Sequence, residues 1–284
     1  NDNIFLDDED ETSDMIYTTG LGLRQEVLWQ TAGAILNYEP SYSWYRDEGD
    51  LDEWRHLVEA RIYKEFAKRT RLDLRNTYLW TTRPTDESDE RDSDNPREGR
   101  QIEADTNRRG RETYYTNVAT AKINHQYGEK DSIYAGFEYR RLRQVENTSR
   151  GGNDNDNNEN DIYTPSAGIE YWFTPQWGFS LDGEYSRRDL KNDDDRKIAD
   201  GTFRFLRKFT RHLDGFIGYN HSYVTYDDED ENPDYQVYRP SLGIRWQLER
   251  NAYVRLGAGY YWQVVDDSDN PDVDDSNESG FLLD

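Results

Sequence analysis

The chain has 284 residues, a formal net charge of −24 and no cysteine, and these values exclude several classes of protein. A surface this acidic repels phosphates, so we expect no nucleic-acid partner. The lack of cysteine excludes disulfides, thiolate metal sites, CxxCH haem attachment and a cysteine nucleophile. No apolar run reaches the roughly 18 residues that a membrane-spanning helix needs. No apolar leader precedes Asn1, so we expect a mature or trimmed chain.

The composition combines two features that rarely occur together. Only 33% of the residues are hydrophobic and the mean hydropathy is −1.17, which is poor in core-forming residues for a water-soluble globule. Aromatic residues nevertheless make up 14%, whereas disordered chains are depleted in them. A membrane β-barrel resolves this conflict, because only every second strand residue need be apolar while its lumen and loops can be polar.

Alternation of apolar and polar residues predicts about twelve full strands. In chain order they lie near 14–28, 31–45, 53–67, 71–83, 111–127, 132–145, 162–173, 177–188, 199–209, 213–226, 235–248 and 252–265. Two short apolar segments, 3–6 and 280–283, predict two further strands, so twelve to fourteen are visible. We therefore expect residues 1–284 to form one all-β, up-and-down antiparallel transmembrane barrel, either whole or as part of a larger one.

Short turns alternate with long acidic connections along the chain. The turns lie around 29–31, 68–70, 128–131, 174–176, 210–212 and 249–251, and the long connections span roughly 46–52, 84–110, 146–160, 188–197, 227–235 and 266–279. Such asymmetry is typical of an outer-membrane barrel, with periplasmic turns at one end and extracellular loops at the other. It predicts a bacterial outer-membrane protein surrounded by outer-membrane lipid.

Each clearly alternating strand has one apolar face, which begins or ends in Trp, Tyr or Phe. In the last full strand, for example, Leu256, Tyr260 and Trp262 share one face while Arg255 lies on the other. Aromatic residues at the ends of an apolar face are typical of the girdle at a membrane–water interface.

The opposite face carries charges of both signs in equal number and is expected to face the lumen. The cations are Arg24, Arg61, Arg75, Arg140, Arg204, Lys208, Arg239, Arg245 and Arg255, and the carboxylates are Glu39, Glu59, Glu65, Asp73, Glu138, Glu170, Asp182, Glu184 and Asp214. The candidate lumen-lining residues are Glu170, Asp182, Glu184, Arg204, Arg239, Arg245 and Arg255. They would line a water-filled conduit for hydrophilic solutes, or pair across strands and fill the interior.

The sequence gives little support for a catalytic, metal or cofactor site, and we expect none. His221 and Ser222 are a candidate pair for a barrel enzyme, but adjacent strand residues point to opposite faces. Acidic runs such as 7–11 and 227–231 offer oxygen ligands for Ca²⁺, but they lack EF-hand spacing. Solvated loops are the simpler interpretation of these runs.

Three short segments resemble a known family. The opening Asp2–Asp7, the following Ser13–Thr18 and the strand Tyr42–Arg46 are similar to outer-membrane barrels of the beta-barrel porin 2, or exopolysaccharide-locus, type. The resemblance implies a transport barrel without catalytic residues, and an export or diffusion channel.

The combined hypothesis is an outer-membrane channel for hydrophilic material, and the favoured material is an exported polysaccharide. Such an exporter would need a periplasmic partner, because the outer membrane has no ATP. Three alternatives remain open: a general or anion-tuned diffusion porin, a barrel that sheathes an electron-conducting cytochrome, and a barrel enzyme acting on lipid or peptide.

Overall fold

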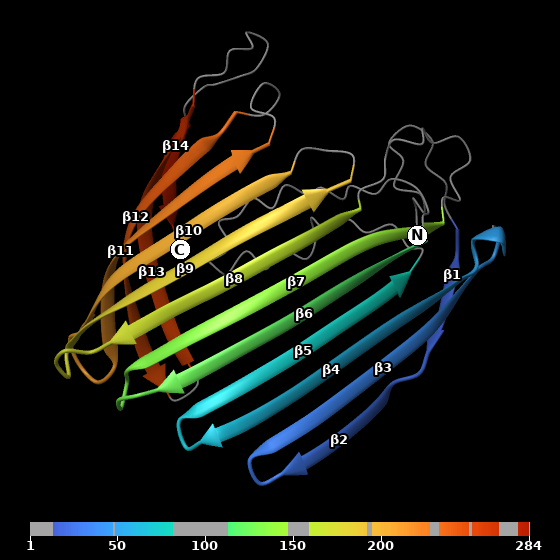
Figure 1. Ribbon diagram of the computed structural model, residues 1–284, viewed down its shortest axis with the longest axis horizontal. Coiled ribbons are helices and arrows are strands. Elements are labelled where there is room, and N and C mark those ends of the chain that lie inside the picture. The colour runs from blue at the N-terminus through green and yellow to red at the C-terminus, as the bar shows by residue number, and fades with distance from the viewer. Residues whose placement is uncertain are drawn as a thin grey trace.

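The computed structural model describes residues 14–47, 49–81, 113–146, 159–191, 195–227, 233–249, 252–266 and 278–283. They form one antiparallel up-and-down sheet of fourteen strands, shown in Figure 1. The strands are β1 (Ile16–Gly20), β2 (Leu23–Trp29), β3 (Ala32–Tyr45), β4 (Glu53–Ala67), β5 (Thr70–Thr81), β6 (Thr113–Gln126), β7 (Ser132–Glu146), β8 (Asn160–Tyr171), β9 (Trp177–Leu190), β10 (Arg196–Lys208), β11 (Leu213–Tyr226), β12 (Tyr235–Glu249), β13 (Ala252–Val265) and β14 (Ser279–Leu283). A 3₁₀ turn, η1 (Gly49–Leu51), lies between β3 and β4.

The predicted all-β fold and the strand positions are confirmed, with two differences. The strand predicted over 14–28 is divided, because β1 pairs with one half of β3 and β2 with the other half. The break at 21–22 lies beside Pro40, whose missing N–H cannot extend the ladder, although its carbonyl accepts a 3.0 Å hydrogen bond from Leu21 N. The predicted segment 280–283 is β14, whereas 3–6 lies outside the described residues.

The short turns lie at one end of the sheet, and the strand ends that border the longer connections lie at the other, as Figure 1 shows. We call these the turn end and the loop end. The loop predicted over 188–197 is shorter than expected, because β9 continues to Leu190 and β10 begins at Arg196. The ladder continues into this region, and the remaining short connection is closed by Asp195, whose Oδ1 accepts a hydrogen bond from Leu190 N at 2.9 Å.

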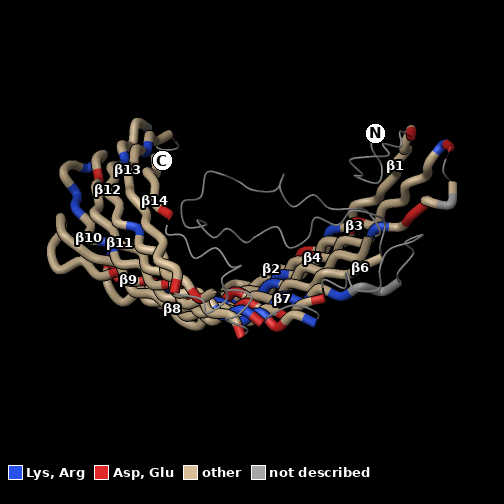
Figure 2. The backbone as a smooth tube through the Cα atoms, turned by 90° about the horizontal axis from the view of Figure 1, so that it is seen from above, with Lys and Arg blue, Asp and Glu red and all other residues tan. Residues whose placement is uncertain are grey.

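The sheet is strongly curved, and Figure 2 shows it as a wall with β1 and β14 at its two separate edges. Side chains alternate between the two faces along each strand, and directly opposed residues of neighbouring strands share a face. The registers of the strand pairs therefore extend each assignment of a face from strand to strand.

Apolar side chains point mainly away from the concave face. Among the described residues, buried hydrophobic side chains number five, and all of them lie on the concave face: Tyr45, Tyr114, Leu142, Val224 and Val237. On the convex face, by contrast, Ile217 is 68% exposed, Leu242 60% and Leu256 59%. No described helix is long and apolar enough to cross a membrane. Among the residues that the structure describes, the sheet thus has a broad exposed apolar face that no second layer covers.

Candidate functional site

The convex face carries aromatic side chains in two rows. The row near the loop end contains Tyr17, Trp44, Trp54, Trp80, Tyr115, Tyr163, Tyr238 and Trp262, and the row near the turn end contains Phe66, Tyr171, Trp177, Phe205 and Trp246. Many of these rings contact a ring on the next strand, with centroids 5.0 Å apart for Tyr42 and Trp54 and 5.3 Å apart for Tyr238 and Trp262. Rows of this kind have the arrangement expected of interfacial girdles.

The distance between the two rows is somewhat shorter than the apolar thickness of an outer membrane. Pairs of aromatic residues eight positions apart on one strand recur on three strands, as Tyr163 and Tyr171, Trp177 and Tyr185, and Tyr238 and Trp246. Eight residues extend about 27 Å along a strand, or roughly 20 Å across the membrane at a tilt of about 40°. Known outer-membrane barrels have an apolar band of about 25 Å.

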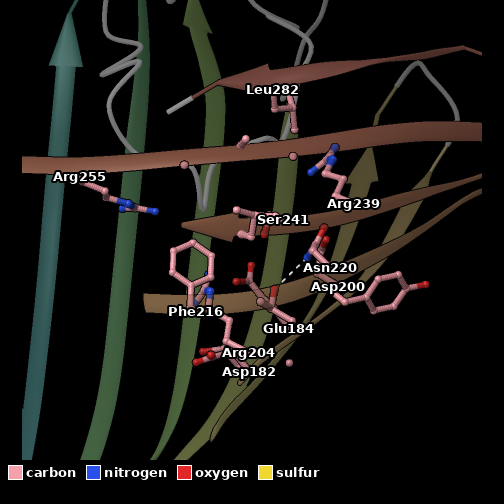
Figure 3. Close-up of a pocket in the computed structure, with 18 of the residues that line it drawn as sticks. Asp182, Glu184, Asp200, Arg204, Phe216, Asn220, Arg239, Ser241, Arg255 and Leu282 are labelled. Carbon is pink, nitrogen blue, oxygen red and sulfur yellow. Dashed lines mark hydrogen bonds between the residues drawn. The ribbon is translucent and has the colours of Figure 1, made fainter. Parts of the chain in front are cut away.

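Two adjoining cavities lie on the concave face of β6 to β14, and we call them together the hollow. The first has a volume of about 380 Å³ and is shown in Figure 3; the second, of about 570 Å³, lies nearer the turn end. Tyr134, Asp182, Arg204, Phe216 and Arg255 line both cavities, which makes the hollow continuous along the strands.

All seven residues that the sequence singled out as lumen-lining candidates line the hollow. Asp182, Glu184, Arg204, Arg239 and Arg255 line the first cavity, and Glu170 and Arg245 line the second. In Figure 3 the labelled cations and carboxylates approach the cavity from several strands. The role of the hollow as a channel lumen stays a prediction.

A tyrosine and a glycine position the Asp182 carboxylate. Tyr134 on β7 lies across Gly168 on β8, where a Cβ atom would come within 2.4 Å of the ring. Its hydroxyl donates a 3.0 Å hydrogen bond to Asp182 Oδ1 on β9. The absence of a side chain at Gly168 therefore allows one side chain to connect three strands.

Three other carboxylates of the hollow, Glu170, Asp200 and Asp214, are also held by neighbours in the wall. Glu170 accepts a 2.7 Å hydrogen bond from Trp172 Nε1, and Ser222 Oγ donates a short hydrogen bond to Asp200. Asp214 forms an ion pair with Arg245 at 2.9 Å. These contacts fix the carboxylates against the wall.

Three lysines of the hollow lie over aromatic rings. Lys122 Nζ is 4.2 Å from the centroid of the Tyr134 ring. Lys130 and Lys208 lie over the rings of Trp172, at 4.8 and 5.4 Å. An aromatic ring attracts a cation through its quadrupole but does not neutralise its charge.

The concave face of β2 to β5 lies outside the hollow and has compensated charges. Asp73 accepts hydrogen bonds from Arg61 Nε at 3.1 Å and Arg75 Nε at 3.0 Å. Arg24 pairs with Glu26 at 3.3 Å. The charges predicted for the lumen are therefore arranged differently in the two halves of the sheet.

The His221 and Ser222 side chains lie on opposite faces. Ser222 donates to Asp200 on the concave face, whereas the His221 ring stacks on Tyr238 on the convex face with centroids 4.7 Å apart. They cannot act as a catalytic pair in this arrangement. Within the described ranges no group of three His, Cys, Asp or Glu residues could hold a metal ion, and most of the acidic runs lie outside those ranges.

Sequence reasoning missed Lys122, Lys130, Tyr134 and Trp172, which the structure adds to the hollow. Tyr134 and Lys122 have the correct strand parity, and this signal could have found them. Lys130 lies in the turn between β6 and β7, so its place in the hollow depends on the shape of that turn and not on strand parity.

Comparisons with known proteins place little constraint on this chain. No protein-family model and no curated protein matches it. The CymD monoaromatic hydrocarbon channel is a similar solved structure, with 13% sequence identity, a TM-score of 0.38 and coverage of 88% of this chain and 84% of that chain. A likeness at this level assigns neither a family nor a substrate, and the resemblance to the exopolysaccharide-locus barrels stays a hypothesis.

Proposed function

We propose that the protein is a bacterial outer-membrane channel that passes hydrophilic solutes along its concave face. The observation that carries this proposal is the opposite character of the two faces of one curved sheet. The convex face exposes an apolar band between two aromatic rows, while the concave face holds a charged hollow. A contiguous exposed apolar surface of this kind needs an apolar surrounding, and lipid provides one.

The direct test is single-channel conductance of the refolded protein in a planar bilayer, at several salt concentrations. We expect stable current steps that grow with salt concentration. Protein that is shown to be folded and inserted but passes no current would contradict an open channel. A soluble protein that never associates with lipid would contradict the membrane placement itself.

Within this function, we infer that a polysaccharide is the exported material. The support comes from aromatic side chains in the hollow, because rings of this kind stack on sugar rings. Trp172 and Tyr134 both line the second cavity beside the carboxylates Glu170 and Asp182. A periplasmic partner would then supply the direction of transport, since the outer membrane has no ATP.

Partial block of the current by sugar oligomers tests this substrate class. Oligosaccharides added on the turn side should interrupt the current for longer than polyethylene glycol of the same size. Equal block by both polymers would favour a general diffusion porin. Co-purification with a haem protein would instead favour the role of a sheath for a cytochrome.

A further inference from the structure

The hollow carries more positive than negative charge, although the whole chain has a net charge of −24. Of its described lining residues, the cations with side chains on the concave face or in the turn below it are Lys122, Lys130, Arg204, Lys208, Arg239, Arg245 and Arg255. The carboxylates are Glu170, Asp182, Glu184, Asp200 and Asp214. Arg207 also lines the second cavity, but its guanidinium lies over the Trp177 ring at 4.4 Å and does not add to the positive charge of the concave face.

The excess of positive charge is concentrated in one row across four strands near the turn end. In the sheet register Lys208 lies opposite Asp214, Asp214 opposite Arg245, and Arg245 opposite Arg255. We call these four residues the basic row. It contains three cations and one carboxylate, and all four residues line the second cavity.

The pairing of Arg245 with Arg255 is unfavourable for the sheet alone. Like charges directly opposite each other on one face destabilise a strand pair. Asp214 offsets part of this repulsion through its 2.9 Å contact with Arg245. Two guanidinium groups beside an open cavity are instead well suited to bind an anion, since their planar N–H donors match carboxylate and phosphate oxygens.

The basic row continues toward β8 through the Trp172 ring, over which lysine ammonium groups lie. Trp172 lies beside Lys208 and also beside Lys130, whose Nζ is fixed by the Pro175 carbonyl at 2.9 Å. The nearby Glu170 carboxylate accepts the indole N–H of the same ring. The turn end of the hollow is therefore bordered by cations on both sides of Trp172.

We propose that the basic row makes this channel selective for anionic solutes, and that its substrates carry carboxylates. This proposal rests on the proposed function and names the substrate class of the same site. Charged rings of one sign set the sign of the ions that a pore accepts, and low-dielectric walls focus their field. An anionic polymer that enters at the turn end would meet the basic row first and the aromatic and charged wall above it next.

The first measurement is the reversal potential in a KCl gradient, for the native protein and for Arg255→Glu. The native channel should pass Cl⁻ in preference to K⁺, and Arg255→Glu should lower the permeability ratio by about threefold, because it changes the local charge by two units. Arg24→Glu is the matched control, since Arg24 lies on the concave face of β2 outside the hollow and should leave the ratio nearly unchanged. A native channel that prefers K⁺, or equal effects of both variants, would overturn the proposal.

The second measurement is binding of an oligogalacturonate to the folded protein in detergent micelles by calorimetry, with a maltooligosaccharide of equal length as the neutral reference. We expect binding of the anionic oligomer alone, weakened by Arg255→Gln and by salt. Binding without any conductance would remove the proposed channel and keep the anion site. Conductance without anion preference or anion binding would support the channel and contradict the anion site. The absence of conductance and of anion binding would contradict the channel and the anion site together.

Discussion

The hydroxyl of Tyr134 donates a 3.0 Å hydrogen bond to Asp182 Oδ1, and its ring reaches this carboxylate by lying over Gly168 on the intervening strand. One side chain thereby connects β7 with β9 across β8. The contact fixes a carboxylate that lines both cavities of the hollow.

Substitution of Gly168 should show whether this contact stabilises the wall. Gly168→Ala places a Cβ atom 2.4 Å from the Tyr134 ring, so the ring must move and the hydrogen bond to Asp182 should be lost. We expect the free energy of unfolding in lipid vesicles to fall by about 1–3 kcal/mol. In a Tyr134→Ala background the same substitution should cost less, because only the 2.7 Å approach of the Cβ atom to Asp182 Oδ1 remains. Equal losses in both backgrounds would contradict the coupling.

Tryptophan quenching should separate the two faces of the sheet. Trp172 lies on the concave face, whereas Trp246 lies in the turn-end row of the convex face. Brominated lipids should quench the emission of Trp246, and aqueous acrylamide should quench that of Trp172. Because the chain has 8 tryptophans and several share the convex face with Trp246, the test uses variants that keep one tryptophan each. The variant with Trp172 alone should be quenched by acrylamide, and the variant with Trp246 alone by brominated lipid. The opposite assignment would show that the faces are reversed.

A pair of neighbouring arginine substitutions should distinguish the faces by stability. Leu242 is 60% exposed on the convex face, and the adjacent Ser241 lines the first cavity. Leu242→Arg should lower the free energy of unfolding in vesicles by about 2–4 kcal/mol, because it places a charge in the apolar band. Ser241→Arg serves as the control and should change it by less than about 1 kcal/mol. Urea titration followed by circular dichroism measures both, and similar losses would argue against a lipid-facing convex surface.

The Asp73 carboxylate should stabilise β4 and β5 more than an exposed ion pair does. Its side chain is 18% exposed and contacts Arg61, Arg71 and Arg75. Asp73→Asn leaves three neighbouring guanidinium groups without this carboxylate, so we expect a loss of about 1–2 kcal/mol that becomes smaller in high salt. Glu26→Gln in the exposed pair with Arg24 is the control and should have little effect. An equal, salt-independent loss in both variants would contradict this explanation.

Period-two alternation was sufficient to predict the strands and their faces, because one face of this sheet is apolar and the other polar. It placed β4, β11 and β13 at their observed bounds. It did not predict the division of the first strand, although Gly20 precedes the break, Gly22 lies in it and Pro40 lies beside it. Local residues can explain this break only once the partner strand is known.

The hollow could be predicted only in part. The parity of each strand identified the charged residues of the concave face, but it could not show that Arg255 shares a cavity with Tyr134. That proximity comes from the curvature of the sheet between β7 and β13, and parity contains no information about curvature. The balance of charge also differs between the predicted face and the hollow. The predicted carboxylates Glu39, Glu59, Glu65 and Asp73 lie in the other half of the sheet with three predicted cations, Arg24, Arg61 and Arg75. The hollow also gains Lys122 and Lys130 against Asp200, so equal numbers along the whole face become an excess of cations there.

The division of the first strand has a consequence for the direction of the two edges. Because β1 and β2 occupy successive parts of one position beside β3, the described strands fill an odd number of positions, and β14 points the same way as β1. Direct union of these edges would create a single parallel seam, with evenly spaced and slanted hydrogen bonds, in an otherwise antiparallel ring. An entirely antiparallel ring requires one more strand between β14 and β1, running opposite to both.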